Sequence, residues 1–204
     1  MTENRQKFFD RLVILPESAL LDIGLAYILA KYAHRAQVRK EKDEKGELVR
    51  YFEHPRRVAL ILIDELHIVL PEMIIAALLH DGIEDTREIT PASLERYFGP
   101  EVTTIVRQLS KVPKEGFAER LLNLGNWKAL VLKACDRLDN LRSLSAGTVD
   151  FQRKQIRETK EVYYPIFARL LEIVPNEYRN QAVYLKAQIE LLIQETEERL
   201  VQNP

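Results

Sequence analysis

Residues 78–86 read LLHDGIEDT and follow directly on the apolar run MIIAA, which predicts a buried helix. The segment places one histidine and three carboxylates within six positions, and a buried helix is an unusual place for such a cluster. A solvated charged face at the helix end is one interpretation, and a metal centre is the other. The four ionisable residues are His80, Asp81, Glu84 and Asp85.

The bulk composition indicates a globular intracellular protein. The chain has 204 residues, 46% of them hydrophobic, which suffices for one substantial core and predicts a single domain over residues 1–204. A net charge of −1 provides no overall field for binding nucleic acid or an anionic membrane, so any anion site must be local. The single Cys135 excludes an internal disulfide and fits the reducing cytoplasm. We therefore expect a cytoplasmic protein with neither signal peptide nor membrane span.

Apolar residues recur mostly at three- and four-residue spacing, which predicts an all-α helical bundle. The helix expected around residues 19–38 has a broad apolar surface that comprises Leu21, Ile23, Leu25, Ile28 and Leu29. In residues 90–100, Thr90 is the predicted cap of a short helix that stops at Gly99. The scarcity of period-two alternation argues against a β-sheet. Residues 40–50, charged and interrupted by glycine, are expected to be the least structured segment.

A long C-terminal helix is expected over about residues 176–202. Its apolar residues recur on one side, while the opposite side is rich in glutamate. Packing of this side onto the rest of the chain is one interpretation, and a homodimer through helical surfaces is the other. The apolar side comprises Tyr178, Ala182, Leu185, Ile189, Leu192 and Leu200.

Two further residues complete a candidate metal site. Glu84 lies four positions after His80, so on a helix the two side chains project near the same place one turn apart. His54 opens another helical pattern, HPRRVALIL, and Asp136 lies in the apolar segment KACDRL. An aspartate in such surroundings pairs with a basic residue or binds a cation. Two imidazoles with two carboxylates suit manganese, iron or zinc better than calcium.

In this order the motifs resemble the HD-type hydrolase domain of RelA/SpoT homologues, the enzymes that degrade (p)ppGpp. AHRAQVRK is similar to that family's A-H-x-G-Q-x-R-K, YFEHP to Y-x-x-H-P, and AALLHDGIEDT to A-x-L-L-H-D-x-x-E-D-T. LERYFGPEVTTIVRQLSKV, KACDRLDNLRSL and ETKEVYYPIFARL follow the later motifs. The resemblance spans about residues 22–172 and implies an HD-domain helical bundle.

The resemblance also implies roles for individual residues. The metal ligands, usually around Mn²⁺ in this family, would be His54, His80, Asp81 and Asp136. Glu84 and Asp85 would act on the nucleophilic water. The substrate contacts would be Arg39, Lys40, Tyr51, Asn140, Ser143 and Tyr163.

The implied activity is metal-dependent 3′-pyrophosphate removal from ppGpp, yielding GDP and pyrophosphate. The length suggests a stand-alone small alarmone hydrolase. Two departures, Asp139 in place of a histidine and an insertion over residues 41–50, leave open another 3′- or 2′-phosphorylated nucleotide, such as NADPH, as substrate. A non-catalytic alarmone-binding module with the same fold is a further alternative.

Overall fold

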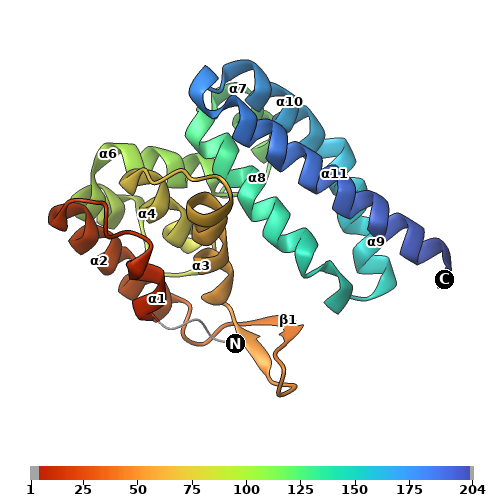
Figure 1. Cartoon of the computed structure of the whole chain (residues 1–204), viewed down its shortest axis with the longest axis horizontal. Helices are drawn as coiled ribbons and strands as arrows, with labels where there is room; N and C mark the ends of the chain where they lie inside the picture. Colours follow the sequence, from red (N-terminus) through yellow and green to blue (C-terminus); the bar gives the residue numbers. More distant parts are fainter. Residues whose placement is uncertain (1–4, 203–204) are drawn as a thin grey trace. The chain divides into compact units, whose positions relative to one another are not determined.

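The computed structural model describes residues 5–202, which form two compact units divided at Phe117 (Figure 1). Apart from one two-stranded hairpin, the regular elements of these residues are helices, and the predicted all-α class is confirmed. No helix within residues 5–202 has both the length and the apolar composition that crossing a bilayer requires. The two units are described separately below.

The first unit is built around α4 (Pro71–Leu79), and all its residues from Met73 to Leu79 are buried. Pro71 occupies the first turn, where the missing N–H of proline costs no hydrogen bond. Helices α2, α3 and α6 pack against α4 (Figure 1). The helical elements of this unit are α1 (Arg5–Asp10), α2 (Glu17–Ala33), α3 (Glu53–Leu60), the π-helical turn η1 (Ile61–Glu65), α4, α5 (Gly82–Asp85) and α6 (Pro91–Leu109).

Helix α6 begins as the sequence predicted. The Thr90 side chain accepts a hydrogen bond from the backbone N–H of Ser93, and the Ser93 hydroxyl accepts one from the N–H of Thr90. This reciprocal capping box satisfies two donors that a helix start leaves without partners. The predicted stop at Gly99 is a kink within α6, because Gly99 has φ +80° and Pro100 follows it.

Residues 40–50 are not the least structured segment, contrary to expectation. Most of them belong to an antiparallel hairpin of β1 (Val38–Lys42) and β2 (Leu48–Arg50). The Asp43 carboxylate accepts hydrogen bonds from the backbone N–H groups of Lys45 and Glu47, and Gly46 takes φ +82° in the turn. In the first strand, VRKEK, the half-buried positions carry charged side chains, so a search for alternating apolar residues did not reveal the hairpin.

The packing side of α2 shares only Ile23 fully with the apolar surface that the sequence suggested. The residues buried in the middle of the helix are Ile23, Ala26, Tyr27 and Ala30. Leu21, Leu25 and Ile28 are 67%, 44% and 52% exposed. Apolar residues lie all round this helix, and the side with two alanines is the one that packs on α4.

In the second unit, α11 (Arg179–Gln202) runs along α8 (Trp127–Arg142) and α10 (Tyr164–Ile173) (Figure 1). Leu185 and Ile189 of α11 are fully buried. The predicted apolar side therefore packs largely within its own unit, the first of the two interpretations. The remaining helical elements are α7 (Phe117–Leu124), at whose start the units divide, η2 (Leu144–Ala146), α9 (Val149–Glu158), η3 (Thr159–Tyr163) and η4 (Asn176–Tyr178).

A π-helical turn, η3, connects α9 to α10. Pro165 follows in the first turn of α10. Proline lacks an N–H and its ring clashes with the preceding helical turn, and wider π turns accommodate such interruptions. Residues 149–173 thus form three consecutive helical pieces.

Candidate metal centre

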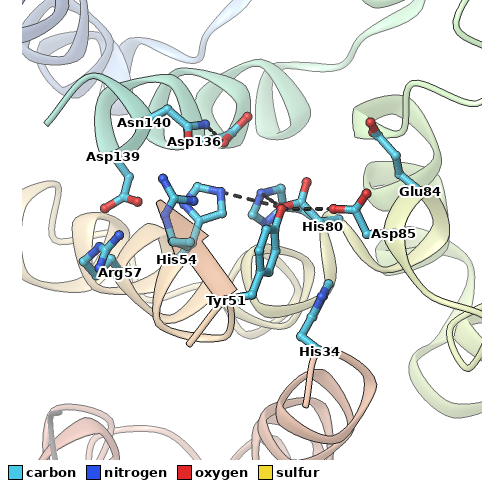
Figure 2. Close-up of polar contacts among 12 residues, drawn as sticks. His34, Tyr51, His54, Arg57, His80, Glu84, Asp85, Asp136, Asp139 and Asn140 are labelled. Carbon is cyan, nitrogen blue, oxygen red and sulfur yellow. Dashed lines mark hydrogen bonds and ion pairs between the residues drawn. The ribbon is translucent and has the colours of Figure 1, made fainter. Parts of the chain in front are cut away.

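Three predicted ligands converge in the first unit. His54 lies in the first turn of α3, His80 directly follows α4, and Asp81 precedes α5. One ligand atom from each lies within 4.8 Å of the others. Asp81 Oδ2 is 3.1 Å from His80 Nε2 and 3.6 Å from His54 Nε2, and the imidazole rings stand edge to face at 5.1 Å (Figure 2).

A hydrogen bond on the side of the ring away from Asp81 fixes the orientation of His80. Its Nδ1 donates a hydrogen bond of 2.8 Å to the Ala77 carbonyl, because a carbonyl oxygen only accepts. This bond leaves the Nε2 lone pair on the side of Asp81, as in metal-binding histidines. His54 and His80 are 1% and 3% exposed, and Asp81 is more accessible. The donor set of two imidazole nitrogens and a carboxylate fits a divalent transition metal, with room for further oxygen ligands.

Tyr51 adjoins this group through its hydroxyl. The Tyr51 oxygen lies 2.8 Å from Asp81 Oδ2 and 3.0 Å from Asp85 Oδ2 (Figure 2). Burial and the neighbouring charges of Asp81 and Asp85 raise the pKa of Tyr51 above its ordinary value. Tyr51 is therefore held as a neutral phenol with a proton to donate.

The acidic pair Glu84–Asp85 divides between two environments. Both residues lie on the one-turn helix α5. Asp85 is directed to the Tyr51 hydroxyl, and its backbone carbonyl accepts a hydrogen bond of 2.8 Å from Gln37 Nε2. Glu84 Oε2 instead accepts a hydrogen bond from the Lys111 backbone N–H at 3.1 Å, with Lys111 Nζ 4.0 Å from Glu84 Oε1. The structure thus brings Asp85 into the group around Asp81, while Glu84 is fixed from the end of α6.

The turn that carries these residues leaves no room beside Gly82. A Cβ at this position would lie 2.6 Å from two side-chain carbons of Ile89 and 2.8 Å from its Cβ. Ile89 is 1% exposed, and its Cβ cannot move without its backbone. Close packing of α5 on residue 89 therefore requires glycine after Asp81.

Arg39 and Lys40 do not form one cationic patch. They are adjacent on β1, so their side chains point to opposite faces of the hairpin, and Arg39 is half-buried whereas Lys40 is exposed. Glu41 lies 3.7 Å from Arg39 Nε and 2.8 Å from the Arg57 guanidinium. A ligand on one face of the hairpin would meet one of these two cations.

Asp136, the fourth predicted ligand, belongs to the second unit. Its Oδ2 lies 2.8 Å from Lys133 Nζ, and its Oδ1 accepts a hydrogen bond of 2.6 Å from Asn140 Nδ2. Both carboxylate oxygens are thus oriented by neighbours one turn away on α8. Asp139, the departure from the family pattern, is 2% exposed.

The other predicted substrate contacts of this unit have structural partners. The Ser143 hydroxyl donates to the carbonyls of Asp139 and Asn140 at 3.4 and 3.3 Å, at the C-terminal end of α8. Tyr163 is 3% exposed, and its ring lies under the Arg137 guanidinium at 4.4 Å.

Three residues around these groups were not predicted to have a role in the site. Gln37 supports Asp85, Lys111 supports Glu84, and Lys133 pairs with Asp136. Lys133 carries a sequence signal, because residues three apart on a helix are neighbours. Gln37 lies in the quoted motif AHRAQ, but its contact is 48 residues distant, so local spacing gives no indication of it.

Comparison with known proteins agrees with this architecture. Residues 26–123 match the model of the HD domain family, so this stretch of the chain is an HD domain. The resemblance to RelA/SpoT-type proteins is confirmed. The chain is 33% identical over 168 residues to the bifunctional (p)ppGpp synthase/hydrolase SpoT of Escherichia coli strain K12, covering 76% of this chain and 23% of that protein.

Two further matches extend the comparison. The GTP pyrophosphokinase rsh of Brucella melitensis is 36% identical over 161 residues, covering 72% of this chain and 20% of that protein. The chain thus spans about a quarter or less of the length of these curated relatives. A solved structure described as a metazoan ortholog of SpoT that hydrolyzes ppGpp has a TM-score of 0.68 at 24% identity, covering 89% of this chain and 97% of that one, which bears on the fold.

Proposed function

We propose that the chain is a metal-dependent hydrolase that removes the 3′-pyrophosphate of ppGpp, releasing GDP and pyrophosphate. The observation that carries the proposal is the convergence of His54, His80 and Asp81 within 4.8 Å. A relative from Escherichia coli O157:H7, named guanosine-3′,5′-bis(diphosphate) 3′-pyrophosphohydrolase, is 33% identical over 168 residues and supports the choice of substrate.

In this proposal the three residues bind a divalent ion, with Mn²⁺ as the preferred metal, and Asp136 is the fourth ligand assigned by the motif. When bound, the ion neutralises phosphoryl charge and lowers the pKa of a water molecule. Glu84 and Asp85 act together on that water, orienting it and accepting its proton. These two roles rest on the motif, and the fixed orientation of both carboxylates supports them.

The proposed substrate contacts also follow the motif. Arg39 and Lys40 supply local positive charge from opposite faces of the hairpin, while Asn140 and Ser143 contact base or sugar. Tyr163 is assigned beside them, although Arg137 covers its ring. The cytoplasm is the proposed location of the reaction.

A second candidate keeps the centre and changes the substrate to another 3′- or 2′-phosphorylated nucleotide, such as NADPH. The hairpin favours this candidate, because it contains the inserted residues 41–50 and also carries Arg39 and Lys40. A phosphorylated nucleotide with one terminal phosphate would need fewer cations than ppGpp.

The test is incubation of the purified chain with Mn²⁺ and a panel of phosphorylated nucleotides that includes ppGpp. We expect pyrophosphate release from ppGpp by the wild type and none from His80→Ala. His67→Asn is the matched control, because His67 is exposed and takes φ +52°, which asparagine tolerates. Absence of pyrophosphate release at micromolar enzyme would refute the proposal, and a kinetic preference for another nucleotide would establish the second candidate.

A further inference from the structure

The hydroxyl of Tyr51 is the meeting point of two carboxylates. Asp81 Oδ2 and Asp85 Oδ2 lie 2.8 and 3.0 Å from the same phenolic oxygen (Figure 2). A phenol has one proton to donate, so the two acids share a single donor. Asp81 belongs to the metal centre and Asp85 to the pair that acts on water, and the Tyr51 hydroxyl links these two functions.

Two histidine rings and two backbone hydrogen bonds hold the Tyr51 side chain in place. It stacks on the His34 ring at 4.8 Å with an interplanar angle of 25°, and His54 meets it edge-on at 6.0 Å. The backbone N–H of Tyr51 donates to the Gln37 carbonyl at 3.0 Å. The backbone N–H of His54 in turn donates to the Tyr51 carbonyl at 2.9 Å. The hydroxyl therefore has a defined position before any ligand arrives.

The same scaffold reaches Asp85 by a second route. His34 Nδ1 lies 2.7 Å from Gln37 Oε1, and Gln37 Nε2 donates to the Asp85 carbonyl at 2.8 Å. Residues 34–37 thus hold both the tyrosine and the backbone of the acid that the tyrosine contacts. His34 is 1% exposed, so this is an internal support.

The motif assigns Tyr51 as a substrate contact. We propose that Tyr51 is instead a positioning residue whose hydroxyl holds the Asp85 carboxylate against Asp81. The proposal rests on the function proposed above for its catalytic part and on the geometry alone for its metal-binding part. Without the hydroxyl, two carboxylates that converge on one oxygen repel each other and separate. Asp81 then loses its fixed orientation as a ligand, and Asp85 loses its fixed distance from the water.

The variant Tyr51→Phe tests this role, because phenylalanine keeps the ring that stacks on His34 and removes only the hydroxyl. The first measurement is the Kd for Mn²⁺ alone, by titration calorimetry of the full chain. We expect Mn²⁺ to bind about tenfold more weakly, within the range observed when an outer support of a metal ligand is removed. The control is Tyr97→Phe, since Tyr97 is 51% exposed on α6.

The second measurement separates kcat from KM with ppGpp at saturating Mn²⁺. A positioning role lowers kcat about 10- to 100-fold and leaves KM unchanged, because substrate binding does not involve the hydroxyl. In an Asp85→Asn background the same substitution should lower kcat no further. Equal melting temperatures of both tyrosine variants would show that Tyr51→Phe is folded.

Two results would overturn the proposal. A raised KM with unchanged kcat and Mn²⁺ affinity would make Tyr51 a substrate contact, and unchanged values of all three would give the hydroxyl no role in the site. If the wild type does not act on ppGpp, the proposed function fails separately. The Mn²⁺ titration then decides alone whether Tyr51 positions Asp81.

Discussion

Lys133 and Asp136 form an ion pair of 2.8 Å one turn apart on α8, and their side chains are only 4% and 9% exposed. A buried charge is costly unless an opposite charge and hydrogen bonds compensate for its lost hydration. Asn140 donates to the other carboxylate oxygen, so Asp136 is engaged on both sides. The buried, charged Asp136 carboxylate therefore depends on Lys133 and Asn140 to compensate for its lost hydration.

We expect Lys133→Met to lower the free energy of unfolding by about 3 kcal/mol, because it removes one partner of a buried pair and leaves the other charged. Urea unfolding of the full chain measures the change. Asp136→Asn in the same chain should restore part of the loss, since no charge is then left buried. A loss below about 1 kcal/mol would mean that the pair stabilises no more than an exposed one.

Asp81→Asn should weaken Mn²⁺ binding at least about tenfold, because an amide replaces the carboxylate shared by two imidazoles and the Tyr51 hydroxyl. Titration calorimetry measures the Kd, with His67→Asn as the control. Unchanged affinity in Asp81→Asn would place the metal elsewhere.

Glu84→Gln should abolish most turnover while metal binding persists. The amide oxygen of glutamine can still accept the hydrogen bond from the Lys111 N–H, so the loop stays in place. We expect kcat for ppGpp to fall about 10²- to 10⁴-fold, the usual contribution of a general base. The exposed Glu95 on α6 provides the control, Glu95→Gln. Retained turnover in Glu84→Gln would leave Asp85 as the sole acid acting on water.

The Arg35–Glu88 ion pair should make stability depend on pH. A hydrogen bond from Arg35 at 2.8 Å lowers the pKa of Glu88 below its ordinary value of 4.5. Because the folded pKa is lowered, the stabilisation is present above pH 4.5 and is lost as the pH falls through the folded pKa. Glu88→Gln should therefore lower the melting temperature at neutral pH, and this difference should shrink as the pH falls below 4.5.

Arg35→Gln is the companion measurement for this pair. It should produce the same pH-dependent difference in melting temperature, and high salt should reduce both differences because Arg35 is 51% exposed. A difference that persists in acid would assign the effect of Glu88→Gln to packing instead of charge.

The sequence predicted those features that depend on local patterns. Thr90 acts over a few residues, and its role as a cap followed from residue type alone. Residue type also marked a break at Gly99, but this break is a kink inside α6 and not the predicted end of the helix. His80 and Asp81 are neighbours in the sequence, so their proximity could be predicted without knowledge of the fold. Bringing in His54, 26 positions earlier, depended on the motif order, and the structure places it within 4.8 Å of both.

Contacts over long distances in the chain could not be predicted from spacing. The role of the Tyr51 hydroxyl depends on residues 30 and 34 positions away. The hairpin depends on an Asp43 turn between charged strands, which lack an apolar alternation. Apolar residues lie all round α2, so its sequence does not indicate which side packs on α4.

The contact between Gly82 and Ile89 restricts how this turn can evolve. A Cβ at residue 82 would overlap the Ile89 side chain, including its Cβ at 2.8 Å, so a larger residue after Asp81 requires glycine at position 89 or a shift of the backbone. The order in which the two substitutions occur matters. A lineage that first shortens residue 89 passes through a folded intermediate with a small void, whereas one that first enlarges residue 82 displaces the turn bearing Glu84 and Asp85. Side-chain sizes at these positions should therefore vary inversely among descendants of this chain.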